Sequence, residues 1–269
     1  MRTLDDAAVV EEAALLDHAE HTSTQVRQTT DAHPHATIDD AYRIQAAWLA
    51  RRLARGERVV GHKIGLTSRA MQATMKIDTP DSGFLTDRMV FAADSTLRAA
   101  DFCDPKLEIE LAFVLGADLA GSELSIDDVL DATEYVVPAV ELIAARTFRT
   151  DPVTHRTRTV VDTIADNAAD AGVITGGHKI GPRDVDLRWV AAIGTRNGVV
   201  EETGVAAGVL GHPAAGIVWL ARRYAEQGQR LEAGQLVLAG SFTRPIDVRA
   251  GDRFEFEYGP LGSFGVDFA

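Results

Sequence analysis

Cysteine and long apolar runs are both scarce in this sequence. Cys103 is the one cysteine among 269 residues, which excludes an intrachain disulfide and a cysteine-rich metal site. No apolar run reaches the ~18–20 residues that a membrane-spanning helix requires. The first twelve residues carry four acidic side chains and lack the basic-then-apolar order of an export signal. We therefore expect a soluble, cytoplasmic protein.

Positive charge is scarce as well. The 27 Lys and Arg residues are outnumbered by 40 Asp and Glu residues, which gives a formal net charge of −13. Such a charge repels nucleic acids and anionic membranes, so neither is an expected partner. The sequence also contains no phosphate-binding glycine motif and no nucleophile elbow. An anionic substrate would need a local positive site, either a bound metal or a few placed Lys and Arg side chains.

The residue pattern is helical at the start of the chain. Ala7–Leu16 is rich in Ala, Glu and Leu, and residues 20–34 form a polar stretch. Thr37 is an N-cap candidate for a second helix, in which Ile44 and Trp48 belong to an apolar series at helical spacing. These features predict a helical N-terminal region over residues 1–57.

The pattern becomes β-like after residue 58. Val59–Gly65 is a short apolar run bounded by glycines, and Leu107–Leu111 alternates strictly between apolar and acidic residues. Asn197-Gly198 is typical of a hairpin turn, and Pro213 occupies the expected first position of one further helix. We expect other strands at residues 136–142, 171–176, 235–240, 253–258 and 263–268. The predicted fold class is therefore α+β, with a β-rich domain over residues 58–269.

Three carboxylates are candidates for a metal site. Glu108 and Glu110 point to the same side of the predicted strand, where like charges repel unless a cation lies between them. Glu141 lies in the otherwise apolar run Val136–Ile143, where a lone charge is costly to bury. Carboxylates without thiols suit Mg²⁺ or Mn²⁺ better than Zn²⁺. A solvent-facing strand surface is the alternative for the Glu-x-Glu pair, and the spacing alone leaves both open.

Lys63 and Asp81 are further candidates. Lys63 interrupts the glycine-bounded run, where glycines permit close approach of the backbone to a ligand. An outward-facing lysine on an edge strand is the common alternative. Asp81 and Ser82 occur in a turn-like segment, and Asn167 precedes a predicted strand, so turn formation or capping explains them equally well.

Seven strings, distributed nearly end to end, carry a family resemblance. They are residues 61–68 (GHKIGLTS), 78–90 (DTPDSGFLTDRMV), 106–115 (KLEIELAFVL), 131–142 (DATEYVVPAVEL), 162–172 (DTIADNAADAG), 202–213 (ETGVAAGVLGHP) and 231–245 (LEAGQLVLAGSFTRP). By these strings the chain resembles the hydratase and decarboxylase branch of the fumarylacetoacetate hydrolase superfamily. Within that branch it is most similar to enzymes that hydrate 2-oxohept-4-ene-1,7-dioate in homoprotocatechuate breakdown. The resemblance implies a mixed β-sandwich roll preceded by helices, and a homo-oligomer.

The resemblance also implies roles for the candidate residues. Glu108, Glu110 and Glu141 would hold Mg²⁺ or Mn²⁺, Lys63 would be the active-site lysine, and Asp81 would be the acid/base group. The implied substrate is a small 2-oxo dicarboxylate. Water would add to 2-oxohept-4-ene-1,7-dioate, formed from 2-hydroxyhepta-2,4-diene-1,7-dioate, to give 4-hydroxy-2-oxoheptane-1,7-dioate.

Five other residues are expected to contact the substrate. We assign general contacts to Ser82, Asn167 and Ser241. The second carboxylate of a C7 substrate needs a cation away from the metal, and a guanidinium can grip a carboxylate with two hydrogen bonds. Arg88 and Arg244 are the two candidates, because both lie in strings that resemble the dioate enzymes. For each arginine, pairing with a local acid is the alternative.

Several activities share these features. The alternatives are a 2-hydroxypenta-2,4-dienoate hydratase, a 4-oxalocrotonate decarboxylase and an acylpyruvate-type hydrolase. From another class, the alternative is a non-catalytic partner subunit of a sister enzyme. Association with a downstream aldolase or a sister decarboxylase is a further expectation of the resemblance.

Overall fold

The strands of the computed structural model form two mixed sheets. The structure describes residues 2–68, 72–73 and 77–269. The larger sheet contains β1 (Val59–Gly65), β2 (Asp81–Thr86), β3 (Val90–Ala92), β5 (Lys106–Leu115), β6 (Thr133–Ile143), β7 (Asp170–Thr175), β10 (Leu236–Leu238) and β11 (Ile246–Asp247). The smaller sheet contains β4 (Thr96–Leu97), β8 (Ala191–Arg196), β9 (Val199–Val205), β12 (Arg253–Glu257) and β13 (Ser263–Phe268). These strands confirm the predicted β-rich region.

Strand order places β5 and β6 in the middle of the larger sheet. Within the described residues that sheet runs β2-β1-β10-β5-β6-β7-β3, with β11 paired to β5, and the smaller sheet runs β4-β13-β12-β8-β9. The β5–β6 pair is antiparallel, whereas β1–β10 and β3–β7 are parallel. Long central strands with neighbours on both sides give a rigid support for side chains that project from them.

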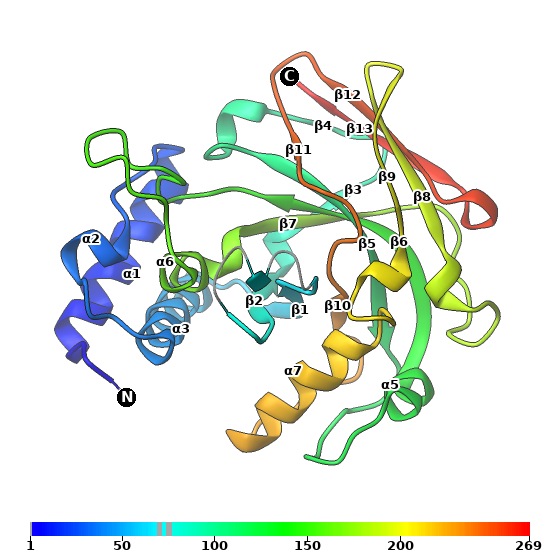
Figure 1. Cartoon of the computed structure of the whole chain (residues 1–269), viewed down its shortest axis with the longest axis horizontal. Coiled ribbons are helices and arrows are strands. Elements are labelled where there is room, and N and C mark those ends of the chain that lie inside the picture. Colours follow the sequence, from blue (N-terminus) through cyan, green and yellow to red (C-terminus); the bar gives the residue numbers. More distant parts are fainter. Residues whose placement is uncertain (1, 69–71, 74–76) are drawn as a thin grey trace.

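The helices gather mainly at the N-terminal end of the chain. They are α1 (Asp6–Thr22), α2 (Thr29–Ala32), α3 (Ile38–Ala54), α5 (Ile126–Ala132), α6 (Val160–Ala165) and α7 (Ala215–Glu226). In Figure 1, α1, α2 and α3 lie together at one side of the sheets, whereas α7 lies below them. No helix within the described part of the chain is long and apolar enough to cross a membrane. Helices beside mixed sheets confirm the α+β class.

Local sequence signals account for most of the helix and turn positions. Thr37 caps α3 as predicted, because its hydroxyl accepts a hydrogen bond from the Asp40 N–H at 3.3 Å. Asn197 and Gly198 form the predicted turn between β8 and β9, with φ angles of 55° and 79°. Helix α7 begins at Ala215, so the prediction that Pro213 is its first residue was wrong.

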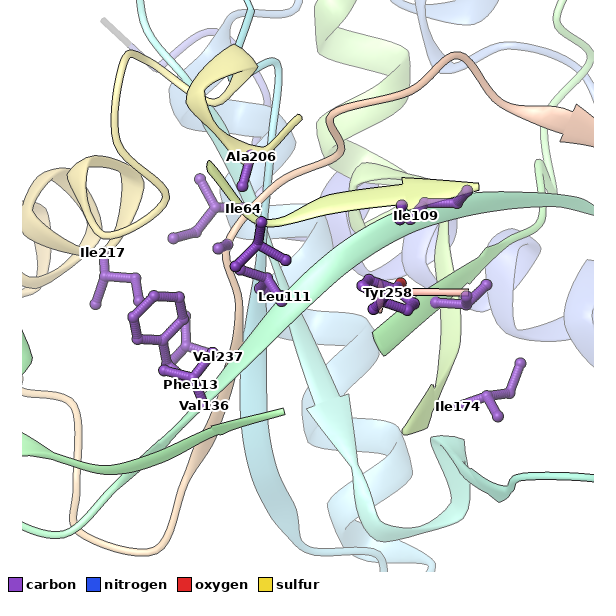
Figure 2. Close-up of a cluster of buried hydrophobic side chains, with 14 of the residues drawn as sticks. Ile64, Ile109, Leu111, Phe113, Val136, Ile174, Ala206, Ile217, Val237 and Tyr258 are labelled. Carbon is purple, nitrogen blue, oxygen red and sulfur yellow. The ribbon is translucent and has the colours of Figure 1, made fainter. Parts of the chain in front are cut away.

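The first hydrophobic core lies between the two sheets. This core includes side chains of β1, β5, β6, β7, β10 and α7. Figure 2 labels several of them, among them Ile64, Phe113 and Ile217, which lie close together. On β5, Leu107, Ile109, Leu111 and Phe113 are fully buried in this core. Because side chains alternate along a strand, the intervening Glu108 and Glu110 project from the other face of the larger sheet.

The N-terminal helices share a second core with that other face. Leu16 of α1 and Trp48 of α3 pack in one cluster with Ala112 of β5 and Val173 of β7. Helix α1 extends six residues beyond the predicted Leu16, into the stretch read as polar, and ends at Thr22. Buried Asp17 explains this extension, because it pairs with Arg51 of α3 and accepts a hydrogen bond from Trp48. The boundary between residues 57 and 58 stays a prediction.

Candidate active site

Three carboxylates converge on the face of the larger sheet that carries the second core. Glu108 lies directly opposite Glu141 in the β5–β6 register, and Glu110 lies two residues further along β5. One carboxylate oxygen of each residue lies within 4.8 Å of the others. Glu110 and Glu141 are fully buried, whereas Glu108 is half-buried. The structure thus brings together the three carboxylates that were proposed as metal ligands.

Among the described residues, several of these buried oxygens have no hydrogen-bond partner, although the Lys63 ammonium forms an ion pair with Glu141. They are Oε1 of Glu110 and both carboxylate oxygens of Glu141. The other oxygen of Glu110 accepts a hydrogen bond from the Gly240 N–H at 2.8 Å. Charged oxygens that lose water without gaining partners are costly, and a divalent cation removes that cost. An all-oxygen, multiply charged donor set fits a hard cation such as Mg²⁺ or Mn²⁺.

Burial raises the pKa values of all three carboxyl groups of the cluster. Burial, reinforced by Glu141, raises the pKa of Glu108 to about 7. Burial raises the pKa of Glu141 to about 8 against the opposing effect of Lys63, and the pKa of Glu110 is raised well above its ordinary value. Without a cation the cluster therefore binds protons near neutral pH, and a metal would compete with those protons.

This competition predicts a pH-dependent effect of metal on stability. A carboxyl whose pKa is raised by folding binds its proton more tightly in the folded state, so its contribution to stability is lost as pH rises from the ordinary value towards 8. We expect metal-free protein to lose thermal stability between about pH 5 and about pH 8, and Mg²⁺ to raise the melting temperature much more at the upper end. Thermal unfolding with EDTA or Mg²⁺ across this range measures it. A Mg²⁺ effect that is equal at both ends would contradict the expectation.

Lys63 and Asp81 lie beside the cluster on neighbouring strands. Lys63 Nζ is 3.2 Å from Glu141 Oε1, and both residues are buried. Asp81 pairs with Gly65 across β1 and β2, and its buried Oδ1 has no hydrogen-bond partner among the described residues. A Cβ atom added to Gly65 would lie 2.3 Å from Asp81 Oδ1 and 2.9 Å from Lys63 Nζ. Glycine at this position therefore lets the two side chains meet.

Lys63 and Asp81 differ in how their surroundings affect protonation. Burial alone would lower the pKa of the Lys63 ammonium, but Glu141, Asp81 and Glu108 outweigh it and raise that pKa. Burial raises the pKa of Asp81, although Lys63 and Arg158 act in the opposite direction. Lys63 is thus a fixed positive charge, and Asp81 is a carboxyl group with an unused oxygen.

A cavity of about 690 Å³ opens onto this cluster. Its wall includes Lys63, Asp81 and Glu108 together with Ser241 and Arg244. Ser241 Oγ is engaged by its own loop, since it donates to the Thr243 carbonyl at 3.0 Å. Arg244 lies at the mouth with 85% of its side chain exposed and pairs with Glu202 at 2.8 Å. A cavity of this size accommodates a small organic acid.

The structure does not bring the other predicted substrate contacts to this cavity. Ser82 is buried in β2 and lies outside the cavity wall. The Asn167 side chain bonds to both backbone groups of Phe84, at 2.8 and 3.0 Å, so it holds the strand that carries Asp81. Arg88 is exposed on the 3₁₀ turn Asp87–Met89 and is also absent from the wall. In this structure these three residues support or flank the site without facing it.

Three residues near the site were missed by the sequence reasoning. Arg149 and Arg158 line the cavity from a segment between β6 and α6 that matches no family string. Asp170 is fully buried at the start of β7, and burial raises its pKa to about 7. Its place in the string at residues 162–172 was the available signal, because a charged residue there directly precedes a strand.

The family follows from comparison with known proteins. The model described as fumarylacetoacetate (FAA) hydrolase C-terminal matches residues 57–268. The chain belongs to the fumarylacetoacetate hydrolase family. This membership confirms the resemblance drawn from the seven strings.

Relatives within this family cover nearly the whole chain. A 2-oxo-hept-4-ene-1,7-dioate hydratase from Escherichia coli is 51% identical over 95% of this chain and 96% of its own length. A 2-keto-4-pentenoate hydratase from Paraburkholderia xenovorans is 38% identical over 96% and 94%. The solved 4-oxalocrotonate decarboxylase from Pseudomonas putida G7, complexed with magnesium and adipate, superposes with a TM-score of 0.94 at 34% identity, covering 100% of both chains. This similarity confirms the predicted fold.

Proposed function

We propose that this protein is a divalent-metal-dependent hydratase that adds water to 2-oxohept-4-ene-1,7-dioate. The substrate forms from 2-hydroxyhepta-2,4-diene-1,7-dioate, and the product is 4-hydroxy-2-oxoheptane-1,7-dioate. The observation that carries the proposal is the cluster of three converging carboxylates, of which Glu108 lines one cavity together with Lys63 and Asp81. The 51% identity to a hydratase of this name supports the choice of substrate.

The carboxylates would hold the metal, for which we propose Mg²⁺. Structures of the P. putida G7 decarboxylase carry magnesium or calcium, which supports a divalent cation. Lewis acidity toward the 2-oxo group and the adjacent carboxylate is the chemistry that such a cation supplies when bound. Glu108, Glu110 and Glu141 would serve as its ligands because their oxygens lack other partners or converge on one point.

Two residues of the chain would act on the substrate itself. Lys63 keeps its proton, so its ammonium group would stabilise negative charge that develops on the 2-oxo oxygen. Asp81 would move the proton between the hydroxyl and C5 that converts the 2-hydroxy-2,4-dienoate, the enol of 2-oxohept-4-ene-1,7-dioate, into the conjugated 2-oxo-3-enoate, since its Oδ1 has no hydrogen-bond partner among the described residues. Water would then add at C4 of this tautomer. The buried surroundings strengthen both interactions by excluding water.

A decarboxylase is the second candidate, because the P. putida G7 decarboxylase shares this fold along its whole length. Loss of CO₂ from 4-oxalocrotonate needs the same stabilisation of negative charge next to a 2-oxo group. Incubation of the purified chain and Mg²⁺ with 2-hydroxyhepta-2,4-diene-1,7-dioate, and separately with 4-oxalocrotonate, distinguishes the two activities. We expect loss of the dienoate absorbance and a hydrated product without CO₂ release. Release of CO₂ from 4-oxalocrotonate, with no hydration of either dienoate, would identify a decarboxylase instead.

The remaining partner predictions are part of this proposal. A homo-oligomer, an association with a downstream aldolase or a sister decarboxylase, and a cytoplasmic location stay predictions. A purely non-catalytic role as a partner subunit is the less favoured alternative, because Lys63, Glu108, Glu110 and Glu141 are all present and assembled. Turnover by the purified chain alone separates an enzyme from such a subunit.

A further inference from the structure

Two arginines lie side by side on the cavity wall. Arg149 and Arg158 belong to the segment between β6 and α6, in which Thr150 and Thr157 form a bridge. The Arg158 N–H donates to the Arg149 carbonyl at 2.9 Å, so the two residues are held next to each other. Both line the cavity that also contains Lys63, Asp81 and Glu108.

The Arg158 guanidinium is a buried charge without a full partner. Its side chain is 10% exposed, and its buried Nη1 has no hydrogen-bond partner in the part of the chain that the structure describes. The nearest recorded carboxylate oxygen, Asp166 Oδ2, is 3.8 Å away. That oxygen already accepts a hydrogen bond from the Arg146 N–H at 2.8 Å, and the other oxygen of Asp166 binds the Arg146 side chain. Arg158 therefore carries positive charge that this acid leaves largely uncompensated.

Arg149 adds to the excess of positive charge. Its guanidinium binds the side chain and carbonyl of Asp104. Burial, followed by repulsion from Arg149, lowers the pKa of Arg158 to about 10. An anion placed against both guanidinium groups would relieve the repulsion and use the vacant donor on Nη1.

The position of Arg149 and Arg158 in the cavity indicates which kind of anion they would bind. Both arginines line the same cavity as Glu108 and Asp81, and their positive charges oppose the effect of burial on those two carboxyl groups. Yet neither arginine forms a recorded ion pair with them within the described residues. A ligand that occupies the metal end of the cavity with one carboxylate can therefore present a second carboxylate to this pair.

We propose that Arg158, supported by Arg149, binds the distal carboxylate of a 2-oxo dicarboxylate and so selects dioates over 2-oxo monoacids of the same length. This inference rests on the proposed function, whose metal end of the cavity receives the first carboxylate. Arg158 takes the role predicted for Arg88, which is exposed outside the cavity. The other candidate for that role is Arg244, which is solvated and paired with Glu202. A bidentate contact to a desolvated guanidinium discriminates more strongly than one to an exposed group.

Binding of unreactive substrate analogues to Mg²⁺-loaded protein tests the proposal. The probes are 2-oxoheptanedioate and 2-oxoheptanoate, which differ in the distal carboxylate, and calorimetry measures both affinities. We expect the parent to prefer the dioate by about ten- to a hundredfold, as a charged hydrogen bond implies. Arg158→Met should abolish this preference and leave the monoacid affinity unchanged. Arg158→Lys should retain part of it, because the charge remains without the planar fork.

Matched variants and a parallel assay make each outcome decisive. Arg156→Met alters an arginine of the same segment that pairs with Asp31 outside the cavity, and it should retain the full preference. Equal losses for both probes in Arg158→Met, or a loss of preference in Arg244→Met in place of Arg158→Met, would overturn the proposal. If Arg158→Met does not melt like the parent, Arg158→Lys and Arg149→Met carry the test, and unchanged preference in both overturns it.

Hydration of the dienoate by the parent is measured separately. If the parent protein prefers 2-oxoheptanedioate through Arg158 but does not hydrate the dienoate, the carboxylate-site proposal stands and the proposed hydratase function is wrong. If the parent protein hydrates the dienoate but binds both probes equally, the proposed hydratase function stands and the carboxylate-site proposal is wrong. The two failures are therefore distinguishable.

Discussion

Replacing Glu141 by Gln is expected to abolish Mg²⁺-dependent turnover while the fold remains intact. Both oxygens of Glu141 are buried, with the Lys63 ammonium 3.2 Å from Oε1 as their one ion-pair partner among the described residues, and Glu141 faces Glu108 directly across the strands. Loss of this ligand removes several kcal/mol of charge stabilisation, which corresponds to a fall in kcat of about 10³-fold or more. Metal-free Glu108→Gln should be at least as stable as the metal-free parent near pH 8, because one mutually repelling carboxylate is gone while Glu141 still pairs with Lys63.

Turnover and thermal unfolding with and without Mg²⁺ measure this prediction. Glu108→Gln should behave in the same way. Glu134→Gln is the matched control, since Glu134 is an exposed glutamate on the same strand as Glu141 and lies outside the cluster. Undiminished activity in Glu141→Gln and Glu108→Gln would show that the three carboxylates do not form the metal site.

The second large effect is expected at Lys63 and Asp81. Lys63→Ala removes the ammonium group beside Glu141, and Asp81→Asn removes the carboxyl group whose Oδ1 is free. Each change should lower kcat by ~10²-fold or more, the range typical of groups that move protons or stabilise charge. The KM should change much less, because chelation by the metal supplies most of the substrate binding.

Steady-state kinetics with saturating Mg²⁺ separates these two parameters. Asp87→Asn provides a control on the same part of the chain, since Asp87 pairs with Arg58 outside the cavity. A variant of Lys63 or Asp81 that raises only KM would show that the residue binds substrate without taking part in the proton transfer.

The central strands and one face of the site could be predicted because their signals are local. Strict alternation in Leu107–Leu111 predicts that Glu108 and Glu110 share a face, and the structure has β5 with this alternation. Glu141 stands out in the sequence because it is a charge inside an apolar strand. Its place directly opposite Glu108 depends on the β5–β6 register, which connects residues 33 positions apart and leaves no local signal.

The distal end of the cavity could not be predicted, for the same physical reason. Arg149 and Arg158 are separated from the carboxylates by a loop, and only tertiary packing brings them to the cavity wall. Arg88 lies in a string typical of the family, yet the 3₁₀ turn that carries it faces solvent. The full length of α1 could not be predicted either, because Asp17 and Glu20 are typical of a loop unless their arginine partners on α3 are known.

Turnover of 2-hydroxyhepta-2,4-diene-1,7-dioate by EDTA-treated protein, before and after addition of Mg²⁺, tests the central claim most directly. Dienoate absorbance gives the rate, and nuclear magnetic resonance of the product identifies 4-hydroxy-2-oxoheptane-1,7-dioate. We predict no turnover in EDTA, recovery on addition of Mg²⁺, and no recovery in Glu110→Gln, whose carboxylate lies in the cluster. Full turnover in EDTA, or the same recovery in Glu110→Gln, would contradict metal-dependent hydration at this site.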